Sequence, residues 1–199
     1  MTHDTLPPDL QTLLDDLSRL ADRSNSTAEE DTPAALLVRE FLKNSWNRCE
    51  ELLGKCRVLR VRPELALGVF GFEIDCPYRR KRHSGDSVEL MLGPVRGRIH
   101  YRLDMFANPG QPYIAVQINS ELAYFHPNCS RQRGSLLCLG EIPPSAFPFG
   151  LDLLVETHLY PIVTYQNRRP AHPCDEEAAR YFALAPEAME GLEPVKPLY

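Results

Sequence analysis

The first part of the chain repeats its apolar residues at helical spacing in two separate stretches. Between residues 9 and 21, leucines recur on one face of a predicted helix and the charged residues lie off that face. Residues 23–31 are rich in Ser, Asn, Thr and Glu and have no apolar period, so a linker is predicted there. Thr32 and Pro33 then offer an N-cap and a proline at the first helical position, and helical spacing continues as far as Gly54. The pattern predicts an N-terminal amphipathic helix, a linker and one long helix.

From Cys56 onward the apolar period changes to two, which is typical of strands. Pro, Gly, Asn and Asp separate the runs, and the short spacings between them indicate antiparallel neighbours in a meander. The predicted strands are Val58–Val61, Leu67–Ile74, Val88–Leu92, Ile99–Phe106 and Tyr113–Ile118.

Helical spacing returns near the C-terminus. Apolar residues from Leu151 to Ile162 follow it, and Pro161 is expected to end or kink that helix near Tyr160. Acidic residues at 175–177 suit the first turn of another helix, because the helix dipole favours negative charge there. The tail from Pro186 has no core pattern and is expected to be loose.

Charge and composition restrict the possible partners and the compartment. The formal charge of −5 argues against nucleic acid as the main partner. The basic run 79–83 is predicted to be a solvated hairpin loop, and a docking patch for an acidic protein is the alternative. No apolar run reaches membrane-spanning length and no signal-type N-terminus precedes the domain, so we expect a cytoplasmic protein that does not enter a membrane. The six cysteines are then expected to be free thiols.

The candidate chemistry lies between His126 and Gly140, where a polar turn-forming run is followed by a lone thiol among aliphatic residues. Cys138 is the predicted nucleophile, and it needs its thiolate form to act. An acyl group passed to it needs a donor that stabilises the oxyanion, and Asn128 is the first candidate. The alternative role of Asn128 is a turn residue that bonds its own backbone.

His126-Pro127-Asn128 followed by a glycine and then by Cys138-Leu139 resembles the core of the ubiquitin-conjugating enzymes. Leu92-Gly93-Pro94 is similar to the Gly-Pro that opens the third strand of that family. The resemblance implies an α+β fold with an N-terminal helix, a four-stranded antiparallel meander, an active-site segment and C-terminal helices. The resemblance covers residues 33 to about 184, which implies a conjugating-like catalytic domain over 32–185. The residue pattern predicts a helical extension and linker over 1–31 and a tail over 186–199. Asn128 and Cys138 are ten residues apart, where the family usually has eight.

The resemblance also implies a reaction and its partners. Cys138 accepts a ubiquitin-like protein from an activating enzyme as a thioester and passes it to a lysine of a target, without nucleotide, metal or other cofactor. Asn128 stabilises the oxyanion or holds the active-site loop, and His126 and Pro127 shape the turn. The differences from the common pattern look like stand-alone bacterial members, which are encoded beside an activating enzyme and a metal-dependent isopeptidase in defence-type operons.

His172 falls about where many conjugating enzymes carry an aspartate or serine that gates the cysteine. An imidazole suits proton removal from an incoming lysine near neutral pH, and a surface loop histidine is the competing interpretation. Cys129 and Cys174 are near enough in sequence to the predicted site to lie beside it, although packed or semi-exposed roles are favoured for both.

Three other classes of protein remain open. An inert adaptor of the same fold would use Cys138 as a core residue. A zinc site could draw on cysteine and histidine atoms, although the close paired spacing of structural sites is missing; the candidates are His126, Cys129, Cys138, His172 and Cys174. A cysteine hydrolase would use Cys138 and His172.

Overall fold

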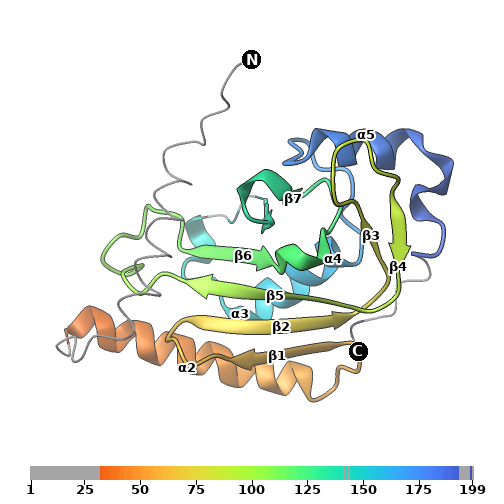
Figure 1. Cartoon of the computed structure of the whole chain (residues 1–199). Helices are drawn as coiled ribbons and strands as arrows, with labels where there is room; N and C mark the ends of the chain where they lie inside the picture. The colour runs from red at the N-terminus through yellow and green to blue at the C-terminus, as the bar shows by residue number, and fades with distance from the viewer. Residues whose placement is uncertain (1–31, 141, 143, 193–197, 199) are drawn as a thin grey trace.

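The computed structural model describes residues 32–192 and 198, except residues 141 and 143. In this part the chain has a mixed α+β fold: a long helix, a sheet of six strands and a group of C-terminal helices (Figure 1). The helix expected over residues 9–21, the linker and the 1–31 extension lie outside the described residues.

Helix α2 spans Pro33–Leu53, which confirms the long helix predicted from the apolar spacing. Thr32 caps it by accepting a hydrogen bond from the Ala35 N–H at 3.2 Å, and Gly54 ends it. Val38, Leu42, Ser45 and Cys49 form its buried face. Trp46 lies beside this face and stacks on Phe70 of the sheet. One stripe of α2 therefore covers the sheet.

The six-stranded sheet has the order β1-β2-β5-β6-β8-β7, and every neighbouring pair is antiparallel. Its first four members form the predicted meander, so the expected four strands are present, but β8 and β7 extend the sheet. Each of these two strands is two residues long, which is too short for an apolar period to reveal. The strands are β1 (Leu59–Pro63), β2 (Val69–Asp75), β5 (Pro94–Tyr101), β6 (Ile114–Ile118), β7 (Cys129–Ser130) and β8 (Leu136–Leu137).

The run Val88–Leu92 forms a strand but does not join this sheet. Strand β4 (Glu89–Met91) pairs with β3 (Tyr78–Arg80) in a separate ribbon, which stands at one end of the sheet beside α5 (Figure 1). The next predicted strand is displaced as well, because β5 begins at Pro94 and ends at Tyr101, and the chain then turns through residues 103–107. Met105 is buried although it lies in this turn, and Leu103 and Phe106 are partly buried there.

The prediction of a solvated loop at residues 79–83 is wrong for Arg79 and Lys81, which are 6% and 8% exposed. Arg79 lies in β3, and its guanidinium donates hydrogen bonds to three backbone carbonyls, those of Glu187, Ala188 and Glu190. For residues 186–192 this anchoring also corrects the expectation of a loose tail. The turn η5 (Pro186–Met189) packs against the ribbon, and Ala188, Leu192 and Leu198 are buried.

The first C-terminal helix does not end at Tyr160. It runs from α3 (Leu151–Leu154) through a π-helical turn, η4 (Val155–Leu159), into α4 (Tyr160–Val163). The wider π-helical turn precedes Pro161, which has no N–H to donate to the helical hydrogen bonds, and the helix continues through this proline. After a loop over residues 164–175, α5 (Glu176–Leu184) begins at Asp175, whose carboxylate accepts a hydrogen bond from the Ala178 N–H.

Candidate active site around Cys138

A short hairpin brings Asn128 and Cys138 side by side. Strands β7 and β8 pair Cys129 with Leu137, and the residues just outside this pair are Asn128 and Cys138. The Cys138 N–H donates a hydrogen bond to the Asn128 carbonyl at 2.7 Å. The turn η2 (Arg131–Arg133) and Gly134, with a φ of +67°, close the hairpin. The nine residues between Asn128 and Cys138 are therefore folded back on themselves.

The residues preceding the hairpin form a tight turn around a buried histidine. His126 Nδ1 accepts the Asn128 N–H at 2.9 Å, and the His126 carbonyl accepts the Cys129 N–H at 2.9 Å. The His126 ring is fully buried, is stacked on Tyr124 and lies 4.7 Å from the centre of the Tyr165 ring. Burial lowers the pKa of His126 to about 3, so this imidazole is neutral near pH 7 and shapes the turn without exchanging protons.

The proton of this neutral ring must lie on Nε2, because Nδ1 is an acceptor. Nε2 has no hydrogen-bond partner among the described residues. The aromatic rings of Tyr124, Tyr165 and Phe182 surround the imidazole, and a ring face accepts a weak hydrogen bond from an N–H. Nε2 therefore lies among packed aromatic rings, and a substrate has no access to it.

The Pro127-Asn128 turn also holds the loop before α5. The Asn128 side-chain amide donates to the Asn167 carbonyl at 3.0 Å, and Asn128 is only 2% exposed. The Pro127 carbonyl accepts the N–H groups of Cys174 at 2.8 Å and of Asp175 at 3.1 Å. These bonds fix both ends of the 167–175 segment to the turn that precedes Cys138.

This arrangement places the Cys174 thiol against Cys138. Cys138 is half-buried and Cys174 is exposed. A hydrogen bond from the Cys174 thiol lowers the pKa of Cys138 from 9.0 to about 6; burial opposes this effect and the Gly140 N–H reinforces it. The same contact raises the pKa of Cys174 above its ordinary range, because Cys174 must keep its proton to donate. At neutral pH Cys138 is the thiolate and Cys174 the protonated partner.

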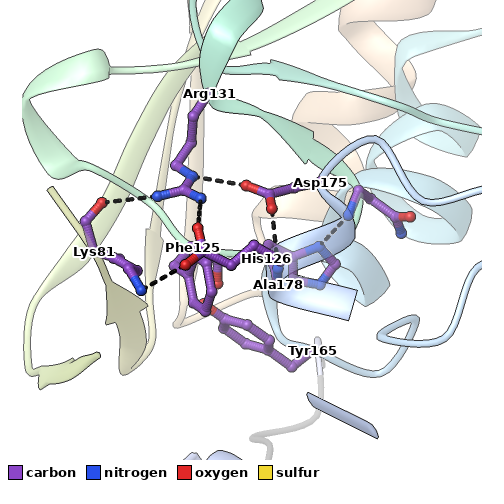
Figure 2. Close-up of polar contacts among 9 residues, drawn as sticks. Lys81, Phe125, His126, Arg131, Tyr165, Asp175 and Ala178 are labelled. Carbon is purple, nitrogen blue, oxygen red and sulfur yellow. Dashed lines mark hydrogen bonds and ion pairs between the residues drawn. The ribbon is translucent and has the colours of Figure 1, made fainter. Parts of the chain in front are cut away.

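An ion-pair network fixes the start of α5 and hence the position of Cys174 (Figure 2). Arg131, in the hairpin turn, donates to Asp175 at 2.7 Å and to Glu177 at 2.8 Å. Lys81 donates to Glu177 at 2.7 Å, and the Arg131 guanidinium lies 4.9 Å from the centre of the Phe125 ring. The hairpin turn and the residue after β3 are therefore joined to the start of α5 through Asp175 and Glu177.

The two remaining predicted residues occupy different surroundings. His172 is exposed in a bend of the 164–175 loop and makes no hydrogen bond or ion pair with any residue that the structure describes. Cys129 is fully buried, and burial raises the pKa of its thiol to about 12. Within residues 32–192, apart from 141 and 143, no three histidine, cysteine or acidic side chains are grouped so that they could hold a metal ion.

A groove of about 690 Å³ lies on the outer face of the meander, away from Cys138. Four arginines line it, Arg60, Arg62, Arg96 and Arg98, together with Glu64 and Glu73. None of the predicted site residues reaches this groove, so the candidate chemistry belongs to the hairpin and the loop before α5. No helix in the described part of the chain is long and apolar enough to cross a membrane.

Sequence reasoning placed Cys174 near the predicted site but favoured a packed or semi-exposed role for it. Arg131 was not singled out, and Lys81 was considered only as part of the basic run 79–83, although both residues fix α5 beside the hairpin. The local signal for Cys174 was its position directly before the acidic start of a helix. A comparison of the chain with protein-family models and with curated proteins found no match.

Proposed function

We propose that this protein is an acyltransferase of the ubiquitin-conjugating type, with an α+β fold related to that family. Cys138 accepts a ubiquitin-like protein as a thioester and passes it to a lysine amine of a target. The single observation that carries the proposal is the half-buried Cys138 directly after β8, bonded to Asn128 of a His-Pro-Asn turn and contacted by a second thiol. The order of elements around it, a long helix, a meander, a cysteine segment and helices, agrees with the resemblance.

In the first step the Cys138 thiolate attacks the thioester carbonyl carbon that links the modifier to a cysteine of the activating enzyme. The carbon–sulfur bond to the activating enzyme breaks, and its cysteine leaves as a thiolate. In the second step a lysine amine attacks the new thioester, loses a proton and forms an amide, and Cys138 leaves as a thiolate. A lowered pKa suits both steps, because Cys138 is first a nucleophile and then a leaving group.

Asn128 supports this reaction by holding the loop, the second of the two roles considered for it. Its Nδ2 donates a hydrogen bond to the Asn167 carbonyl at 3.0 Å, so one of its two side-chain N–H donors is engaged. His126 and Pro127 set the turn that positions Asn128 and Cys174. The partners proposed with this function are an activating enzyme, a ubiquitin-like modifier, a target protein and an isopeptidase acting in the same pathway, in a bacterial conjugation system of the defence type.

The test is incubation of the full chain with the activating enzyme and ubiquitin-like protein of the same organism and ATP. A reductant-sensitive adduct is expected in the unaltered chain, and its loss is expected in Cys138→Ala. Cys56→Ala is a matched control, because Cys56 is also half-buried but lies between α2 and β1. An adduct that persists in Cys138→Ala would refute the proposal. Release of the modifier to water, with no transfer to added lysine, would identify a hydrolase.

His172 is tested by the pH dependence of thioester discharge to free lysine. If its imidazole removes the amine proton, His172→Ala should lower the discharge rate near neutral pH, because the general base of the transfer step is lost. His83→Ala is the control, since His83 is an exposed histidine in the loop between β3 and β4. A normal rate for His172→Ala across this pH range would remove the role.

A further inference from the structure

The contact between Cys138 and Cys174 is built into the backbone around it. The N–H of Cys138 is bonded to the Asn128 carbonyl at 2.7 Å, and the N–H of Cys174 is bonded to the Pro127 carbonyl at 2.8 Å. Two consecutive residues of one turn therefore hold both cysteines, and the Arg131 to Asp175 ion pair fixes the residue after Cys174. The backbones of both cysteines are thereby bonded to consecutive carbonyl groups of the same turn, which brings the two residues together.

Cys138 and Cys174 also differ from the buried cysteines of the described chain in their reactivity toward an oxidant. Cys49 and Cys129 are fully buried, and burial raises the pKa of each to about 12, so they remain inert thiols. Cys138 has a thiolate and Cys174 has an exposed thiol beside it. A reactive thiolate with an adjacent second thiol is the arrangement in which oxidation stops at a disulfide.

We propose that Cys138 and Cys174 form a reversible intramolecular disulfide when the protein meets a hydroperoxide. The Cys138 thiolate attacks the peroxide, the O–O bond breaks, and the products are the sulfenic acid of Cys138 and an alcohol or water. The Cys174 thiol then attacks the sulfenic sulfur, a water molecule leaves and the S–S bond forms. The two sulfurs together lose two electrons, which the peroxide accepts. A dithiol reductant reverses the step.

If Cys138 is the acyl acceptor, as proposed above, the disulfide stops conjugation and protects the sulfur from irreversible oxidation. This regulatory consequence rests on the proposed function, whereas the disulfide itself depends only on the thiol pair. Cys174 lies in a loop before the N-cap of α5 and outside any helix or strand, so the sulfurs can close to bonding distance without breaking the sheet.

The experiment uses the reduced full chain, freed of reductant and treated with one equivalent of hydrogen peroxide under non-denaturing conditions. The intact mass should fall by two hydrogens, two of the six cysteines should resist alkylation after the oxidised chain is unfolded in denaturant, and peptide mapping should link Cys138 to Cys174. Dithiothreitol should restore both thiols. Cys174→Ser should stop at a sulfenic acid on Cys138 that a dimedone-type reagent traps, and Cys56→Ser should behave as the unaltered chain.

Two results would overturn the disulfide. One is oxidation of Cys138 directly to the sulfinic acid in the unaltered chain. The other is the same loss of two hydrogens in Cys174→Ser, which would mean that the disulfide forms without Cys174. Failure of the proposed function is read separately, from modifier loading of the reduced chain. A reduced chain that accepts no modifier refutes the conjugating activity and leaves the mapped disulfide standing. An oxidised chain that still loads Cys138 refutes the regulatory consequence.

Discussion

Removing the Cys174 thiol gives the most direct test of the chemistry of Cys138. The contact with Cys174 is the largest cause of the fall in the Cys138 pKa from 9.0 to about 6. In Cys174→Ala this hydrogen bond is lost while the Gly140 N–H remains, so the pKa of Cys138 should rise toward 9. With a pKa of about 6, roughly nine-tenths of Cys138 is thiolate at pH 7; with a pKa of about 9 the fraction is about one-hundredth.

The rate of alkylation changes less than the thiolate fraction, because a thiolate of higher pKa is a better nucleophile. A Brønsted coefficient of about 0.4–0.5 makes the altered thiolate roughly 15 to 30 times more reactive if the whole shift is lost. Cys174→Ala should then react roughly 3 to 6 times more slowly than the unaltered chain at pH 7 and faster above about pH 8. The two pH profiles should cross.

The assay is alkylation of Cys138 by iodoacetamide under pseudo-first-order conditions, followed by mass spectrometry of the peptide that contains it. Cys174→Ser is the matched variant, since its hydroxyl retains a donor and should keep part of the shift. Cys56→Ala should leave the profile unchanged. An unaltered midpoint in Cys174→Ala would show that the thiol contact does not control the pKa of Cys138, and the stabilisation of its thiolate by Cys174 would be refuted.

Three further predictions concern stability and can be read by urea unfolding. The pKa of His126 is lowered to about 3 in the folded chain against about 6.5 when unfolded, so stability is lost as the pH falls below about 6.5, by roughly 2 kcal/mol at pH 5. His126→Asn should remove this extra pH dependence, and an unchanged pH dependence in the variant would contradict the prediction. Arg79→Ala leaves three backbone carbonyls without their charged donor, so we expect the free energy of unfolding to fall by about 3 kcal/mol and hydrogen exchange to become faster over residues 186–192. Amides that stay protected there would refute the anchoring of this segment by Arg79. Asp175→Ala removes the N-cap of α5 and a partner of Arg131 and should lower the free energy of unfolding by about 1–3 kcal/mol. Asp175→Asn keeps a side-chain acceptor and should lower it less. Equal losses in the two variants would show that the cap does not contribute to stability.

Local patterns predicted the elements that carry a regular period. Thr32, Pro33 and Gly54 marked the ends of α2 correctly, because capping and termination depend on residues within one turn. The apolar period also located β1, β2 and β6. Buried and exposed residues alternate at the start of β1, whereas β2 and β6 contain consecutive buried residues. The Val88–Leu92 run shows where this reasoning stops. Its pattern indicated a strand, but the choice between the meander and a separate ribbon depends on β3.

Charged residues were predicted poorly for a related reason. Arg79 and Lys81 belong to a basic run that is typical of a solvated loop, yet both are buried. Their burial is favourable only because Glu177 and the carbonyls of the C-terminal segment lie opposite them, and no local pattern contains those partners. The packing of residues 186–192, expected to be loose, follows from the same partners.

The sequence alone determined the class of fold, the long helix and the choice of Cys138 as the candidate nucleophile, because hydrophobic period and a distinctive turn are properties of neighbouring residues. Only the tertiary structure decided that the thiol of Cys174 lies against Cys138, that Asn128 holds the loop through Asn167 and that His126 is a buried neutral ring. Each of these depends on a hydrogen bond or a packing contact between segments far apart in the chain. The reactivity of a thiol is set by what surrounds it, and those surroundings come from the fold.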